Sequence, residues 1–128
     1  MKVDVAESRA YLAARAAATH AAREQRRVAA LTAARVAAQA VLPRFPAVRR
    51  AYLFGSVVRP GAMRATSDVD IALDAALDAE TYFAVWRALE RAAGPWELDV
   101  IELGPELHFA ARVRAEGELI YERADQDS

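Results

Sequence analysis

The first third of the chain carries the pattern of a long helix. Residues 1–42 contain neither glycine nor proline, alanine dominates, and arginines recur, which together favour helix. We expect Ser8 to be the N-cap and Pro43 and Pro46 to end the helix. A break near Arg26 is the alternative, and it would give two shorter helices.

Only the second half of this segment has an apolar stripe wide enough to pack on a core. The stripe repeats at helical spacing: Val28, Leu31, Ala34, Ala38 and Val41. Upstream, the apolar face is reduced to Tyr11, Leu12 and small alanines. We therefore expect the first half to be a solvated extension, with a docking surface for a partner as the alternative.

After Pro46, short apolar runs alternate with stretches of helical spacing, which is the pattern of an α/β domain. Four runs have strand character: Val48 to Phe54, Val69 to Leu73, Leu98 to Leu103 and Glu118 to Tyr121. Two stretches between them have helical character: Asp78 to Ala93, closed by Gly94, and Pro105 to about Ala115.

These elements predict an α/β (α+β) fold, in which helices pack against a small mixed sheet of about four strands. We expect an N-terminal helical segment at residues 1–42 and a domain at residues 43–128, which together form a single globular unit.

The composition limits the partners and the metal chemistry. Of the 128 residues, 55 % are hydrophobic and 27 % charged, which is enough apolar material for a core. With 17 basic residues against 18 acidic ones, no field exists that would draw in a long polyanion, so we expect no bulk nucleic-acid binding. Neither a secretion signal nor an apolar run near the ~20 residues of a membrane span is present, which predicts a cytoplasmic protein. Without cysteine and with only two histidines, any metal has to be held by oxygen.

Two carboxylates stand close together at the start of the second predicted strand. Asp68 and Asp70 are two positions apart, so on a strand they share one face while Val69 and Ile71 share the other. Like charges this close repel each other, and a divalent cation that prefers oxygen ligands, such as magnesium, relieves that cost. Asp99 is isolated in the third predicted strand, where strand propensity does not explain it, and we expect it to complete the metal site.

A Gly-Ser pair ends the first predicted strand. Gly55 lets the backbone approach a ligand closely, and Ser56, which opens a short helix, offers hydroxyl and amide donors to phosphate. The pair therefore predicts a place for a triphosphate.

In order and spacing, these residues resemble the minimal nucleotidyltransferase (MNT) family of the DNA polymerase beta superfamily. In that family a Gly-Ser turn, an Asp-x-Asp strand and a later strand aspartate form the site. The resemblance covers roughly residues 48–122 and includes Arg59, Ser67 and the Gly-Glu-Leu-Ile-Tyr run at 117–121. Eleven residues separate Ser56 from Asp68, one more than is common in stand-alone members, so the connecting loop is expected to carry an extra residue.

The resemblance implies a magnesium-dependent nucleotidyltransferase that uses ATP and two magnesium ions. Asp68 and Asp70 would contact both ions, and Asp99 would bind the ion on the acceptor side and help to take the hydroxyl proton. The nucleotide-binding residues would be Gly55, Ser56, Arg59 and Ser67.

The family's best-supported role is that of an antitoxin that adenylylates a tyrosine of its HEPN RNase toxin. The resemblance therefore implies transfer of AMP from ATP to a protein hydroxyl, with a HEPN-type toxin as the partner. One alternative is transfer to a small molecule such as an aminoglycoside, although such relatives carry an additional domain over the acceptor. The other is a non-catalytic antitoxin that acts by contact alone, whose signature would be a broken carboxylate set. Whether the chain forms a homo-oligomer stays open.

Overall fold

The computed structural model describes residues 4–104 and 107–124. Its centre is a four-stranded sheet in the order β3-β2-β1-β4. The strands are β1 (Arg50–Phe54), β2 (Val69–Asp74), β3 (Leu98–Glu102) and β4 (Glu118–Glu122). β1 is antiparallel to both of its neighbours, whereas β2 and β3 are parallel, so the predicted small mixed sheet is confirmed.

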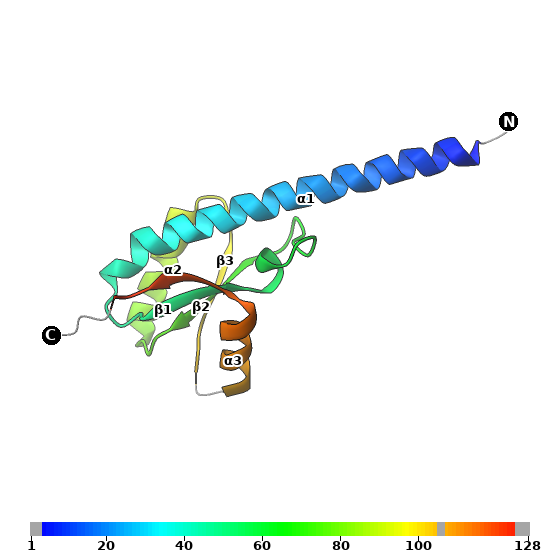
Figure 1. Cartoon of the computed structure of the whole chain (residues 1–128). Coiled ribbons are helices and arrows are strands. Elements are labelled where there is room, and N and C mark those ends of the chain that lie inside the picture. Colours follow the sequence, from blue (N-terminus) through cyan, green and yellow to red (C-terminus); the bar gives the residue numbers. More distant parts are fainter. Residues whose placement is uncertain (1–3, 105–106, 125–128) are drawn as a thin grey trace.

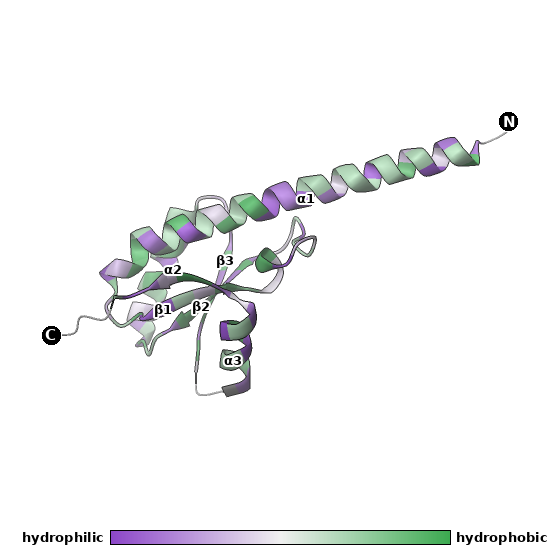
Figure 2. Ribbon diagram, in the orientation of Figure 1, coloured by the Kyte–Doolittle hydropathy of each residue, from purple (hydrophilic) through white to green (hydrophobic). Residues whose placement is uncertain are grey.

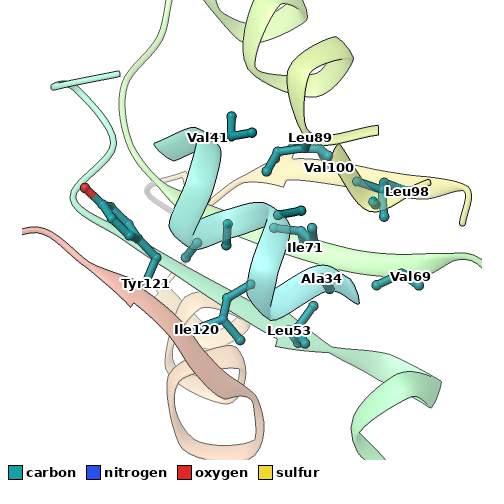
Figure 3. Packing of buried hydrophobic residues seen from close by; sticks show 14 of the residues in the cluster. Ala34, Val41, Leu53, Val69, Ile71, Leu89, Leu98, Val100, Ile120 and Tyr121 are labelled. Carbon is teal, nitrogen blue, oxygen red and sulfur yellow. The ribbon is translucent and has the colours of Figure 1, made fainter. Parts of the chain in front are cut away.

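Helices cover both faces of this sheet (Figure 1). α1 (Val5–Val41) and α2 (Ala79–Ala93) pack against each other on one face, and α3 (Leu107–Glu116) lies on the other. Val69 and Ile71 of β2 are fully buried on the first face, in the core that Figure 3 shows beneath α1. Because side chains alternate along a strand, Asp70 belongs to the α3 face.

α1 is one continuous helix of 37 residues, so the alternative of a break near Arg26 does not occur. Its N-cap is Asp4, whose carboxylate accepts hydrogen bonds from the backbone N–H groups of Ala6 at 2.9 Å and Glu7 at 3.2 Å. The prediction of Ser8 as the cap is wrong, because this carboxylate satisfies the first-turn amides four residues earlier.

The C-terminal end of α1 agrees with the expected role of Pro43. The α-helix ends at Val41, and a single 3-10 turn, η1 (Leu42–Arg44), follows with the proline inside it. Proline has no backbone N–H and therefore cannot continue the α-helical hydrogen bonding.

The second half of α1 packs on the sheet, as predicted. Its buried residues are mostly small: Ala30, Leu31, Ala34, Ala37, Ala38 and Val41. Val28 was expected in this stripe but is 51 % exposed. At about 100° per residue, Val28 lies on the side of the helix, and the inward direction at that turn belongs to its neighbour Arg27.

The first half of α1 lies beyond the sheet (Figure 1). From Val5 to Arg23 every residue except Ser8 is exposed, and Tyr11 and Leu12 keep 64 % and 61 % of their surface in contact with solvent. Weakly apolar and charged residues alternate along it (Figure 2). No helix within the described ranges has both the length and the apolar character needed to cross a membrane.

The remaining elements lie close to their expected bounds. β1 begins at Arg50 rather than Val48, because the Val48 N–H donates to the Phe45 carbonyl at 3.0 Å in a turn before the strand. α2 follows its predicted cap, Asp78, and ends at Gly94. The expected first residue of α3, Pro105, lies outside the described residues.

Candidate active site

Two of the three predicted aspartates occupy matching positions on neighbouring strands. Asp70 of β2 and Asp99 of β3 are register partners in the parallel pair, so both side chains belong to the α3 face of the sheet. Asp68 precedes β2 by one residue. Because it is two positions from Asp70, its side chain is expected on the same face of the sheet. The sheet therefore brings the three carboxylates to one face, near the beginning of β2 and β3.

Two hydrogen bonds from α2 fix the strand that carries Asp99. The Tyr82 hydroxyl donates to the Val100 carbonyl, and the Trp86 indole N–H donates to the Leu98 carbonyl at 3.1 Å. Both donors come from the covered face of the sheet and bond to the residues on either side of Asp99. The backbone of β3 is thus held from behind, while the Asp99 side chain is exposed on the opposite face.

The electrostatic environment of Asp70 disfavours its charged form. Burial, followed by the negative charges of Asp99 and Asp68, raises the pKa of Asp70 from its ordinary value to about 6. Asp68 and Asp99 are exposed, whereas Asp70 is partly buried. In the part of the chain that the structure describes, none of the three has an ion-pair partner.

The donor chemistry of this cluster suits magnesium, since carboxylate oxygens are its preferred protein ligands. The three side chains do not by themselves form a ready-made cage: within residues 4–104 and 107–124, no group of three or more His, Cys, Asp or Glu side chains is arranged to hold a metal ion. Any ion here would have to take further ligands from a substrate and from water. A cation would also remove the repulsion that raises the pKa of Asp70.

Gly55 ends the first strand directly against Asp70. The residue before it, Phe54, is the register partner of Asp70 across the antiparallel β1 and β2 pair. Gly55 has φ +77°, and a Cβ atom placed on it would lie 2.4 Å from the Asp70 Oδ2 atom. Glycine is therefore required at this position, both by the positive φ and by the lack of room for a side chain. The Gly55 turn thus lies directly against the Asp70 carboxylate.

Ser56 and Arg59 follow in the short 3-10 turn η2 (Gly55–Val58) and at its end. Ser56 is partly buried, and its carbonyl accepts a hydrogen bond from the Arg59 N–H at 3.2 Å. The exposed Arg59 lines a cavity of about 170 Å³ between η2 and α3, together with Phe54, Phe109 and Arg112. This cavity adjoins the Gly-Ser turn on the same face of the sheet as Asp70.

Ser67 closes the turn that leads into Asp68. Its hydroxyl accepts a hydrogen bond from the Arg64 N–H at 2.9 Å, and its own N–H donates to the Arg64 carbonyl at 3.0 Å. Ser67 and Asp68 also line a second cavity, of about 350 Å³, whose other walls include Arg26 and Trp96. The structure thus gives Ser67 a turn-forming role, and its predicted contact with nucleotide stays a prediction.

Three residues near the site come from α1 and were missed in the sequence analysis: Glu24, Arg26 and Arg27. Each makes a hydrogen bond to the backbone of the loop between Ser56 and Asp68. The available signal was the helical spacing of Glu24 and Arg27 ahead of Leu31 and Ala34, which continues the packed side of α1 with charged residues. Apolar spacing alone does not reveal such a continuation.

The strand order, the mixed pairing and the helices on both faces agree with the nucleotidyltransferase fold. The chain belongs to the family described as "Polymerase beta, Nucleotidyltransferase", whose sequence model matches residues 37–126. No curated protein matches the sequence.

Solved structures share this fold. One is a crystal structure of a mutant toxin-antitoxin pair, MntA-HpeT, with a TM-score of 0.55 and 24 % identity, covering 66 % of this chain and 70 % of that one. Another is a protein from Sulfolobus solfataricus assigned to the nucleotidyltransferases, with a TM-score of 0.52 and 23 % identity, covering 76 % of this chain and 84 % of that one. At these identities the likeness shows the fold alone.

Proposed function

We propose that this chain is a cytoplasmic, magnesium-dependent nucleotidyltransferase that transfers AMP from ATP to a hydroxyl group of a partner protein. The observation that carries the proposal is the contact between the Gly55 turn and Asp70, with Asp99 in register on the next strand. In this arrangement a turn that can bind phosphate lies beside carboxylates that can hold a metal ion. Displacement at a phosphorus atom needs both groups close together.

Each predicted site residue has a role in this proposal. Gly55 and Ser56 hold the β and γ phosphates, and Arg59 lies at the same turn, where its guanidinium can reach a phosphate oxygen. Asp68 and Asp70 would contact two magnesium ions, and Asp99 would bind the ion on the acceptor side. When bound, these ions would neutralise the charge on the phosphates and activate the acceptor hydroxyl. Asp99 orients the acceptor hydroxyl and helps to take its proton.

The exposure of Asp68 and Asp99 supports a macromolecular acceptor. No element among the described residues covers these two carboxylates on their solvent side. An enzyme for a small acceptor has to enclose that acceptor with its own surface, whereas a protein acceptor brings a surface of its own. A solved structure of similar fold is described as a toxin-antitoxin pair, which favours a toxin as the partner and an antitoxin role for this chain. The resemblance drawn from the sequence implies the finer detail, a HEPN-type toxin with a tyrosine as acceptor.

The test is transfer from ATP labelled at the α phosphate. The full chain is incubated with magnesium and, in separate reactions, with a HEPN-type toxin or an aminoglycoside. Label on a tyrosine of the toxin, abolished by Asp68→Ala and by chelation, supports the proposal. Label on the aminoglycoside alone would identify a small-molecule enzyme. Toxin neutralisation that persists in Asp68→Ala without label would identify an antitoxin that acts by binding.

A further inference from the structure

We propose that Glu24, Arg26 and Arg27 of α1 are positioning residues for nucleotide transfer, because they hold the loop that joins the Gly-Ser turn to Asp68. This inference rests on the proposed function, since it concerns how the same site is kept in shape. The loop comprises residues 57–67 and is flanked by two predicted site residues, Ser56 and Asp68. In Figure 1 it lies beneath α1, where the helix passes beyond the sheet.

Glu24 and Arg27 act on the first half of the loop. The Glu24 carboxylate accepts a hydrogen bond from the Gly61 N–H at the tip of the loop, where the backbone has φ +78°. Arg27 donates to the Val57 carbonyl at 3.2 Å, directly after Ser56. Arg27 also donates twice to Glu24, from Nε at 3.0 Å and from Nη2 at 2.9 Å, so the two side chains fix each other.

Arg26 acts on the second half. Its Nη2 atom donates to the Ala65 carbonyl at 3.0 Å, three residues before Asp68. Its guanidinium carbon lies 4.8 Å from the centre of the Trp96 ring, so the arginine is stacked between the loop and the turn that precedes β3. One helix therefore holds the backbone of both ends of the loop.

These contacts supply what the apolar anchors of the loop do not. Val57 and Met63 are fully buried and attach the loop to the core. Apolar contacts are non-directional, so they keep the loop close but do not fix the path of the backbone between them. Hydrogen bonds from charged side chains to Val57, Gly61 and Ala65 are directional, and they fix that path.

The helix face that makes these contacts is the one that packs on the sheet. Leu31 and Ala34 lie over the sheet, Glu24 and Arg27 follow at helical spacing over the loop, and His20 comes last, against Gly61. All the polar members precede residue 37, where the match to the family begins. The residues that hold the loop therefore lie before the part of the chain that the family's sequence model matches.

The experiment compares full-length variants for their use of ATP with magnesium. Glu24→Ala and Arg27→Ala should raise the KM for ATP, or the Kd of a non-hydrolysable ATP analogue, about 5- to 20-fold, with kcat changed less than about twofold. Glu24→Gln should recover part of the loss, since its amide oxygen still accepts from Gly61. Arg23→Ala is the matched control, an exposed neighbour on the same helix, and should behave as wild type.

Hydrogen exchange separates positioning from folding. Backbone amides of residues 57–67 should exchange faster in Glu24→Ala, while those of β2 and β3 stay protected. Faster exchange with unchanged ATP affinity would overturn the inference, and so would equal effects of Glu24→Ala and Arg23→Ala. If Glu24→Ala does not fold, Arg26→Ala and Glu24→Gln carry the same comparison. Wild-type protein that binds no ATP would instead overturn the proposed function.

Discussion

Asp70 is placed where a negative charge is unfavourable. It is partly buried, lies between two other carboxylates and touches the Gly55 turn, and these surroundings raise its pKa to about 6. A residue that only supported the fold would gain nothing from such a position. Carboxylates held against repulsion are common at sites that bind a cation, because the bound cation supplies the missing positive charge.

This electrostatic cost predicts that Asp70→Asn stabilises the free protein. The pKa of Asp70 is raised in the folded state, so the contribution of its protonated form is complete below the unfolded value near 3.8 and is lost as the pH rises through about 6. At pH 8, Asp70→Asn should raise the free energy of unfolding by about 1–2 kcal/mol, and at pH 4 the difference should nearly vanish. Urea unfolding without divalent ions at the two pH values measures it.

Asp74 is the matched control for this effect. It lies on the same strand and face as Asp70, but it forms ion pairs with Arg50 at 3.6 Å and Arg114 at 3.8 Å. Asp74→Asn should therefore leave stability at pH 8 unchanged or slightly lower. If Asp70→Asn behaves as Asp74→Asn does, neither the burial of Asp70 nor the repulsion from Asp99 and Asp68 destabilises its charged form measurably.

Gly55 predicts a second measurable effect. Gly55→Ala should cost about 2–4 kcal/mol, because the new methyl group meets both a positive φ and the Asp70 carboxylate. Gly94→Ala gives a reference for the backbone cost alone: Gly94 has φ +74° and ψ -123° with nothing within 4 Å of an added Cβ, and alanine should cost about 1–3 kcal/mol there. Thermal unfolding gives both values.

The double variant Gly55→Ala with Asp70→Ala tests the origin of that difference. Removing the Asp70 carboxylate removes the clash with the new methyl group. The double variant should therefore lose less free energy of unfolding than the sum of the losses in the two single variants. Simple additivity would mean that the turn does not press on the carboxylate.

Asp99→Asn should separate nucleotide binding from turnover. Asp99 is exposed at the edge of the cluster and is proposed to serve the acceptor hydroxyl, so its loss should change the Kd of ATP less than about threefold while lowering kcat at least ~100-fold. Calorimetry with magnesium and ATP, followed by the labelled transfer reaction, gives both numbers. Equal loss of both, with an unchanged circular dichroism spectrum, would assign Asp99 to nucleotide binding instead.

At the scale of elements, the strands could be predicted because each is a short apolar run bounded by turn residues. Carboxylates within or beside such runs stand out, and this marked Asp68, Asp70 and Asp99 as candidate site residues. Their register across β2 and β3 could not be predicted, because pairing between strands depends on the whole sheet. The contacts from Glu24 and Arg27 to the loop could not be predicted from apolar spacing, since a charged helix residue is exposed in most proteins.

α1 packs closely because its inner face is built from alanine. Ala34 and Ala38 are buried to 1 % and 0 % exposure between the helix and the sheet, which leaves no space for larger side chains. Ala38→Leu should therefore destabilise the protein by about 1–3 kcal/mol. Ala40→Leu, an exposed position on the same helix, should change stability by less than about 0.5 kcal/mol. Urea unfolding of both variants makes the comparison, and similar values would show that α1 is loosely packed.

At the scale of the whole molecule, α1 divides into two parts that differ in their contacts. Residues from Ala30 onward form the core with the sheet and α2, and Glu24 to Arg27 hold the loop. The part before Glu24 extends beyond the sheet, where Tyr11 and Leu12 are exposed. Isolated helical turns gain little stability without packing, so this projecting part contributes little to the fold.

Two truncations distinguish these parts, and they should give different results. Of the described residues, a deletion of 1–23 removes the cap Asp4 and helix that is exposed except at Ser8. The free energy of unfolding should therefore fall by less than about 1 kcal/mol, and ATP affinity should be kept. Removing residues 1–27 also deletes the loop contacts, so ATP affinity should fall as it does in Glu24→Ala.

In the chain that lacks residues 1–23, transfer to a partner protein should fall more than ATP affinity, because exposed apolar side chains on a projecting helix form a surface that a partner can cover. Thermal unfolding, calorimetry with ATP and labelled transfer, measured on both truncations, make the comparison. Full transfer by the chain that lacks residues 1–23 would make the projecting part a solvated extension, and failure of that chain to fold would show that the exposed turns stabilise the core after all.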